Sequence, residues 1–227
     1  MFEAFPEKLA VVRAEIARAC ERAGRDAREV TIVAVTKKHP IEAMHAALAA
    51  GVLDLGENRV QEALPKLEEL PDTARVHLIG PLQSNKVNKA VGRFASIASV
   101  DRVDLVERIS RRATELECRQ AVWLQVNISG ESQKAGCDPG QAPALADAIR
   151  RQPSLRLLGL MGMGRFDAPE AELRRGFASL RELAARLDSD STEQLGLSMG
   201  MSGDYAIAVE EGATHLRLGT VLFGPRG

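Results

Sequence analysis

Eight short apolar segments recur along the chain, and amphipathic helical segments lie between most of them. The apolar segments are rich in aliphatic and β-branched residues and end at Gly or Pro in most cases, as the buried strands of a parallel sheet do. The predicted strands are residues 30–36, 52–55, 76–79, 95–99, 121–126, 155–161, 195–198 and 214–218. Eight strands that alternate with helices predict an α/β fold of the (β/α)8 TIM-type barrel class.

An additional helix is predicted ahead of the first strand. Apolar residues recur at three- and four-residue spacing across residues 5–23, and Gly24 follows as a stop. A doubly wound open sheet is the alternative fold, but the count of eight strands and the lack of a GxGxxG motif after the first strand weigh against it. No linker-like or repeated segment divides the 227 residues, so we expect one barrel domain over 1–227.

Composition excludes several classes of function. The formal net charge is −1 and no basic tract occurs, which argues against a nucleic-acid partner. No apolar run reaches the roughly 18 residues of a membrane span, and the N-terminus lacks a secretory pattern. We therefore expect a cytoplasmic protein. Cys20, Cys118 and Cys137 are scattered without metal-ligand spacing, so neither a metal site nor a disulfide is predicted.

Lys37 directly follows the first predicted strand and is the strongest candidate for a chemical role. A lysine that leaves a buried strand at its C-terminal end lies where barrel enzymes place their chemistry. A partly desolvated amine there is easier to deprotonate, which suits it to form a Schiff base. The alternative is a solvated lysine at the start of a loop, and this segment taken alone favours that alternative.

The segments after the last two predicted strands carry hydroxyl and backbone donors. In many barrels these two loops hold a phosphate through backbone N–H groups. Ser202 lies in the first of the loops, and Gly219 and Thr220 begin the second. Ser202 could instead only cap a helix predicted over residues 204–211, and Gly219 and Thr220 could form a simple turn. Donors after two adjacent strands favour a phosphate site.

Three further polar residues are candidates. Alternation along residues 214–218 directs Arg217 into the barrel, where its guanidinium needs a carboxylate or an acceptor on a ligand. Asn58, after the second strand, either caps the next helix or contacts a ligand. His77 on the third strand is interpreted as a hydrogen-bonded core residue rather than a catalyst.

Short motifs occur in order along nearly the whole chain. They read AVTK at 34–37, GENRVQE at 56–62, HLIGPLQSNK at 77–86, VNIS at 126–129, GLM at 159–161, SMGMSGD at 198–204, and RLGT at 217–220 with FG at 223–224. Together they resemble the pyridoxal phosphate homeostasis protein family, whose members are related to the barrel domain of alanine racemase. The segments HLIGPLQSNK, SMGMS and RLGT are the most specific.

The resemblance implies a fold-type III barrel that binds pyridoxal 5′-phosphate (PLP) as a Schiff base. The implied cofactor contacts are Lys37 (covalent), Asn58, Ser202, Arg217, Gly219 and Thr220. No catalytic or metal-ligating residue is implied. The implied partners are PLP and the apo-forms of PLP-dependent enzymes, and we expect a monomer.

The resemblance favours a PLP carrier that takes part in intracellular PLP homeostasis, rather than an enzyme. Racemisation needs a second acid/base opposite the lysine, which alanine racemases supply as a tyrosine from an additional domain. Tyr205 is the one tyrosine here, and we expect it at the rim without a catalytic role. The alternatives are a racemase-like PLP enzyme and a barrel that binds a phosphorylated metabolite without covalent chemistry.

Two departures from the family pattern lie beside the implied site. Val76 stands where relatives often carry an aromatic residue. The segment 162–164, Gly-Met-Gly, stands where they often have a small residue, an aliphatic residue and prolines. Both put the shape of the pocket in question.

Overall fold

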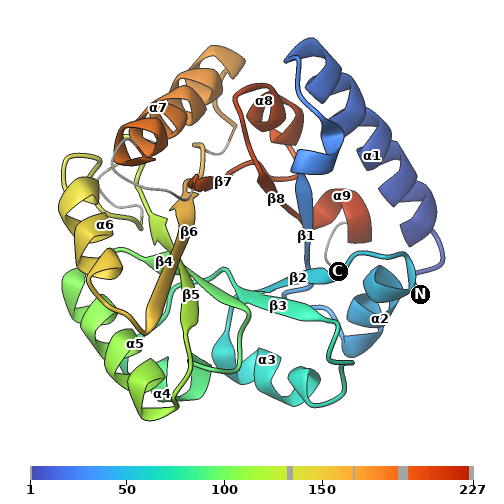
Figure 1. Cartoon of the computed structure of the whole chain (residues 1–227). Coiled ribbons are helices and arrows are strands. Elements are labelled where there is room, and N and C mark those ends of the chain that lie inside the picture. The colour runs from blue at the N-terminus through green and yellow to red at the C-terminus, as the bar shows by residue number, and fades with distance from the viewer. Residues whose placement is uncertain (1, 132–134, 166, 189–193, 225–227) are drawn as a thin grey trace.

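The computed structural model describes residues 2–131, 135–165, 167–188 and 194–224. Its parallel strands close into a barrel in the order β1 to β8, with helices outside (Figure 1). The strands are β1 Thr31–Val35, β2 Asp54–Glu57, β3 Arg75–Leu78, β4 Ser96–Val100, β5 Gln120–Gln125, β6 Leu155–Met161, β7 Gly196–Ser198 and β8 His215–Leu218. The predicted eight-stranded barrel is confirmed.

The helices are α1 Phe5–Arg22, α2 Ile41–Ala49, α3 Val60–Leu67, α4 Val87–Ala90, α5 Val103–Glu115, α6 Ala142–Arg150, α7 Glu170–Asp188, α8 Tyr205–Glu210 and α9 Thr220–Phe223, with 3₁₀ turns η1 Ala27–Glu29 and η2 Ser84–Lys86. The predicted extra helix is α1, which lies against the short helices α8 and α9 (Figure 1). Among the described residues, no helix has both the length and the apolar character that crossing a membrane requires.

The second strand lies two residues later than predicted, whereas the other seven agree to within one residue at each end. β2 contains the buried carboxylates Asp54 and Glu57: Asp54 lies within the predicted segment, whereas Glu57 lies beyond it, where the apolar pattern has ended. Each carboxylate has a cationic partner from another segment: Arg75 binds Asp54 and Lys66 binds Glu57. The pairing that makes this strand possible is tertiary and is not visible in the local sequence.

The apolar core has two parts. The larger cluster lies between the strands and the surrounding helices and includes Leu55, Leu78, Leu216 and Leu218. The smaller cluster consists of Ala98, Trp123 and Met161, which pack with Ile79, Leu158 and Met163. Alternation along each strand separates the two, because successive side chains point to opposite faces.

A polar network lies near the amino ends of the strands. Asp54 accepts from Arg75 at 2.8 and 2.6 Å, and its Oδ1 is 2.9 Å from His77 Nε2. The other ring nitrogen of His77 is 2.7 Å from Ser96 Oγ. Burial alone would raise the pKa of Asp54, but the hydrogen bonds from His77 and Arg75 outweigh it and hold the pKa below its ordinary value. The predicted core role of His77 agrees with these contacts.

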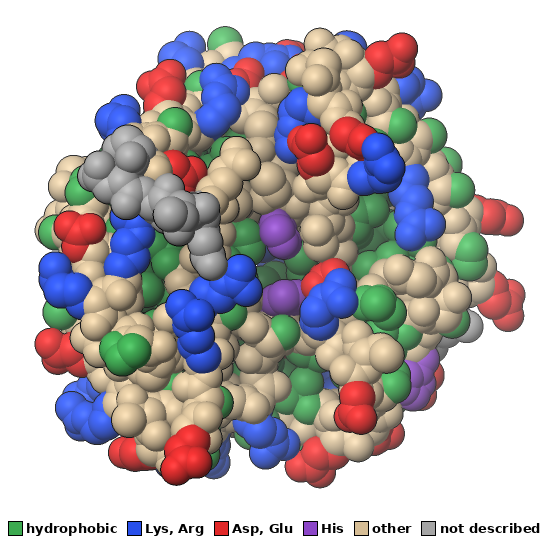
Figure 2. All heavy atoms as spheres, viewed as in Figure 1, with side chains coloured by type: hydrophobic (Ala, Val, Ile, Leu, Met, Phe, Trp, Pro, Cys, Tyr) green, Lys and Arg blue, Asp and Glu red, His purple; other side chains and the backbone are tan. Residues whose placement is uncertain are grey.

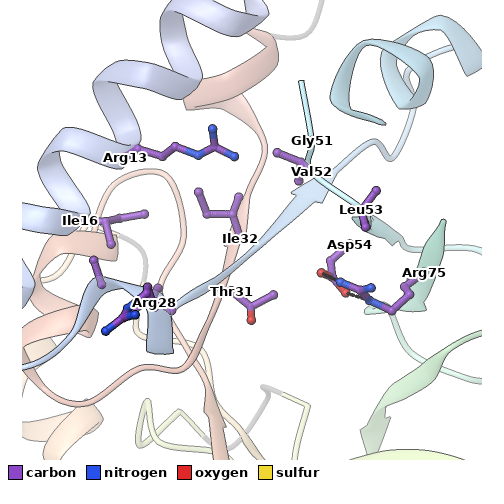
Figure 3. A pocket seen from close by; sticks show the side chains of 12 residues that line it. Arg13, Ile16, Arg28, Thr31, Ile32, Gly51, Val52, Leu53, Asp54 and Arg75 are labelled. Atoms are coloured by element: carbon purple, nitrogen blue, oxygen red, sulfur yellow. Dashed lines mark hydrogen bonds and ion pairs between the residues drawn. The ribbon is translucent and has the colours of Figure 1, made fainter. Parts of the chain in front are cut away.

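One face of the molecule shows histidine side chains near its centre (Figure 2). On the helices around them, Lys and Arg side chains are interspersed with Asp and Glu. A cavity of about 430 Å³ lies between α1 and the amino ends of β1 and β2 (Figure 3). Its carboxylate, Asp54, is already bound by Arg75 and His77, and none of the six implied cofactor contacts lines it.

His215 makes stability sensitive to acid. Burial lowers its pKa from 6.5 to about 4, with smaller contributions from His77 and Arg217 that Asp54 opposes. The unfolded chain therefore binds a proton that the folded chain does not between about pH 6.5 and 4, and stability falls as the pH falls through this window. A shift of this size corresponds to about 3 kcal/mol.

We expect His215→Gln to remove this part of the acid dependence. The two proteins are compared by urea unfolding from pH 7.5 to 4, with the fluorescence of Trp123, whose ring centroid is 4.7 Å from that of His215. Identical pH dependence in the two proteins would contradict the assignment to His215.

Candidate functional site

A cavity of about 560 Å³ opens at the carboxyl ends of the strands. Its lining includes every residue that the sequence implicates in cofactor binding: Lys37, Asn58, Ser202, Arg217, Gly219 and Thr220. These residues follow or end β1, β2, β7 and β8, and the closure of the barrel brings them together. The carboxyl end of a barrel is where sites in this fold class are built.

Lys37 reaches the cavity from a tight turn after β1. His39 N donates to Thr36 O at 3.0 Å, which makes Lys37 and Lys38 the central residues of the turn. Lys38 has a φ of 62°, a conformation that glycine or asparagine usually supplies at this position. Lys37 is partly buried, whereas Thr36 is fully buried. A solvated loop lysine therefore does not describe Lys37.

Ser202 caps a different helix from the one predicted. Its Oγ accepts from Gly219 N at 3.3 Å and Val221 N at 3.2 Å, at the start of α9. The helix α8 begins at Tyr205, and no side-chain hydrogen bond caps it. The loops after β7 and β8 are thus joined through one hydroxyl, whose own proton is available to donate. Both backbone N–H groups are therefore satisfied by Ser202, which itself lines the cavity.

Arg217 points into the barrel as predicted and is 5% exposed. It donates to Ser198 O and Ser198 Oγ, both at 2.7 Å, and to Gly162 O at 2.9 Å. Burial lowers its pKa to about 10, and the Asp204 carboxylate opposes that shift. Arg217 is therefore still cationic at neutral pH. Among the described residues its hydrogen-bond partners are neutral oxygens, so the predicted alternative of a direct salt bridge is wrong.

Asp204 lines the same cavity, and the sequence interpretation assigned it no role beyond the start of a helix. Its Oδ1 accepts from Met201 N at 2.5 Å, which fixes the loop after β7. Burial raises the pKa of this carboxyl, although the Met201 N–H and the Arg217 charge counteract the rise. An acidic residue shortly after a Gly-rich segment was the available signal. It was ambiguous because the same residue type is common at helix starts.

Asn58 lines the cavity after β2, which only β1 separates from β8 in the barrel order. The residue that precedes α3 is Arg59, and no side-chain hydrogen bond caps this helix, so the alternative of a cap by Asn58 is wrong. Gly80 follows β3 and touches the Asn58 backbone: a Cβ on Gly80 would lie 2.3 Å from Asn58 O. Only a glycine at position 80 leaves room for the Asn58 backbone at this distance.

Two expectations about the rim are corrected, and the place of the segment 162–164 beside the cavity is confirmed at Met163. Tyr205 does not line the cavity; it lies near α1, where burial and Glu15 raise the pKa of its phenol. Val76 belongs to the larger core cluster and does not line the cavity, although the family pattern differs at this position. Cβ atoms on Gly162 and Gly164 would lie 2.8 Å from Ile128 Cδ1 and 2.7 Å from Leu173 Cδ2. Close packing thus accounts for the Gly-Met-Gly segment, and of its residues Met163 lines the cavity.

Comparisons with known proteins agree with this geometry. Residues 8–227 match the family described as alanine racemase, N-terminal domain. The pyridoxal phosphate homeostasis protein of Pseudomonas aeruginosa is 45% identical over 224 residues, which cover 97% of this chain and 95% of the relative. The protein of that name from Aquifex aeolicus is 39% identical over 222 residues, 97% of each chain.

Solved structures give the same result. PipY of Synechococcus elongatus, in a structure with PLP bound, is 40% identical with a TM-score of 0.84, over 97% of this chain and 100% of PipY. Alanine racemase of Clostridium difficile has a TM-score of 0.80 at 12% identity, over 97% of this chain and 57% of the racemase, and shares the fold. The sequence matches along almost the full length place this chain in the alanine racemase N-terminal domain family and, within it, among the pyridoxal phosphate homeostasis proteins.

Proposed function

We propose that this chain is a PLP-binding protein of intracellular PLP homeostasis, which holds PLP as a Schiff base on Lys37 without catalytic turnover. One observation carries the proposal: a single cavity brings a partly buried lysine together with the hydroxyls of Ser202 and Thr220 and a buried arginine. The names of relatives at 45% and 39% identity support it, as does the PLP in the PipY structure.

The loops after β7 and β8 are suited to hold the phosphate. The hydroxyls of Ser202 and Thr220 lie on the cavity wall, and the N–H groups of Gly219 and Val221, which donate to Ser202 Oγ, hold the first of them in place. Phosphate oxygens are strong acceptors for hydroxyl donors of this kind. This arrangement would leave the aldehyde end of PLP for Lys37.

When bound, PLP supplies an electrophilic aldehyde and an electron-withdrawing ring. The neutral Lys37 amine would add to the aldehyde carbon, a C=N bond would form, and one water would leave. Arg217 would hold a positive charge beside the pyridine ring and disfavour protonation of the ring nitrogen. An unprotonated ring withdraws electrons less strongly, which suits storage better than reaction.

The positions of the acid and base groups favour a carrier over a racemase-like enzyme. A racemase needs a second acid/base on the face opposite the lysine. Tyr205 lies near α1, and Asp204 is bound to the Met201 N–H. The one tyrosine therefore does not reach the cavity, and the Asp204 carboxylate that does line it has one oxygen engaged in fixing the loop after β7.

We further propose that the protein acts as a monomer and passes PLP to apo-enzymes. In the described ranges the large exposed apolar side chains are Val11, Val103 and Leu116, on α1 and at the two ends of α5. Scattered apolar residues of this kind are usual on monomer surfaces, whereas a permanent dimer needs a contiguous patch.

The function is tested by adding PLP to the purified protein and recording the visible spectrum, then incubating the loaded protein with L- and D-alanine in deuterated water. We expect a stable visible band and no catalytic exchange of the alanine Cα hydrogen for deuterium. Exchange at the rates of a typical enzyme, a kcat of about 1 s⁻¹ or more, would establish the racemase-like alternative instead.

A further inference from the structure

Glu57 is fully buried at the end of β2, next to the turn that carries Lys37. Its Oε1 accepts from Thr36 Oγ1 at 2.8 Å and from Lys66 Nζ at 2.9 Å. Its Oε2 is buried and has no hydrogen-bond partner among the described residues. A single carboxylate oxygen therefore joins β1 to α3.

Lys66 makes a second contact that completes the arrangement. Its Nζ also donates to His39 O at 2.8 Å, and its side chain is 15% exposed. Thr36 and His39 are the first and last residues of the turn, so the Glu57–Lys66 pair holds both ends of the segment with Lys37 between them. The two lysines of this region thus differ in role, because Lys37 lines the cavity and Lys66 does not.

The turn requires such support. Lys38 has a left-handed backbone, which a non-glycine residue keeps only where its surroundings fix the conformation. The surrounding bonds are those of Glu57 and Lys66 at the two ends of the turn, together with the His39 N–H to Thr36 O bond inside it. An apolar pair of equal volume would give similar stability with less desolvation, so stability alone does not account for two buried charges here.

We propose that Glu57 and Lys66 are positioning residues that fix the direction of Lys37 towards the aldehyde end of the cavity. The inference rests on the proposed function, since it concerns how the Schiff-base lysine is presented. It adds two residues outside the cavity to those that govern PLP retention. Neither residue lines the cavity, and both would act through residues 36–39.

The test compares two ligands in one protein. PLP needs both the phosphate donors and Lys37, whereas pyridoxine 5′-phosphate, which lacks the aldehyde, needs only the phosphate donors. In Glu57→Gln the amide would place a buried N–H₂ where no acceptor is present, and the bond from Lys66 would lose its charge assistance. We expect PLP affinity to fall about ten- to a hundredfold, the range for loss of one hydrogen bond to a charged group. Affinity for pyridoxine 5′-phosphate should be unchanged.

Thr36→Val is the milder variant, because it removes only the hydroxyl that donates to Glu57 and keeps the shape of the side chain. We expect it to lower PLP affinity in the same direction, by about tenfold, even if Glu57→Gln does not fold. Glu62→Gln is the matched control: Glu62 pairs with Arg59 at 2.8 Å on the exposed side of α3. The control should leave both affinities unchanged.

A readout without PLP completes the design. The amide of His39 should exchange with solvent faster in Glu57→Gln and Thr36→Val than in the unmodified protein, because its hydrogen bond closes the turn. Two results would overturn the positioning role. One is an equal loss of affinity for both ligands; the other is unchanged PLP affinity in both variants while the unmodified protein forms the visible band. Absence of the band in the unmodified protein overturns the proposed function itself.

Discussion

Lys37→Ala is expected to abolish the visible band that PLP produces with the unmodified protein. The band requires a C=N bond to a lysine, and among the described residues Lys37 is the lysine that lines the cavity. The hydroxyls of Ser202 and Thr220, which we propose as the phosphate donors, remain intact in this variant. PLP should therefore still bind, weakly and without the band. Absorbance spectra and equilibrium dialysis separate the two effects.

Lys38→Ala is the matched control for this experiment. Lys38 is the next residue along the chain and is exposed, so its removal changes the local charge equally. The control should keep the full band. A band that persists in Lys37→Ala, or one that is lost in Lys38→Ala alone, would refute the assignment of the Schiff base to Lys37.

Gly159→Ala is expected to cost about 3 kcal/mol of folding free energy or more, or to prevent folding. Gly159 of β6 pairs with Gly196 of β7, and a Cβ at position 159 would lie 2.0 Å from Gly196 O. Both sides of this contact are backbone, so no change of rotamer relieves it. The strand pair would have to separate, and the barrel closes only if every neighbouring pair forms.

Urea unfolding followed by circular dichroism measures the effect of Gly159→Ala. Gly203→Ala serves as the control, because nothing lies within 4 Å of a Cβ built on Gly203. We expect the control to change stability by no more than about 0.5 kcal/mol. A similarly small effect at position 159 would show that β6 and β7 can move apart without loss of the fold.

The fold was predictable because most of its strands have a recognisable local sequence pattern. The run that became β1 is β-branched and apolar, and β6 was predicted at both ends. The error at the end of β2 has a general cause: a strand that ends in the buried Glu57 depends on Lys66, which lies elsewhere in the chain. Local patterns record burial but not the counter-charges that make burial of an acid possible.

The sequence predicted which residues form the candidate site but not the hydrogen bonds between them. The six implied cofactor contacts were identified from strand ends and from motifs, and all line one cavity. The sequence did not indicate that Ser202 bonds to α9 rather than α8, or that Tyr205 lies near α1. Both outcomes depend on tertiary contacts, of the loop after β7 with α9 and of α8 with α1, which the local sequence does not specify.

The bond between Ser202 and the start of α9 has a consequence for how quickly cargo can be exchanged. Because the hydroxyl already holds the Gly219 and Val221 amides, this side of the cavity, where we propose that the phosphate binds, would keep its shape between one occupant and the next. Neither loading nor unloading would need a segment to order or to melt, so no conformational delay is imposed on either step. The residence time of the proposed cargo would then be set by hydrolysis of one C=N bond. Release would be limited by this chemical step and not by a conformational change.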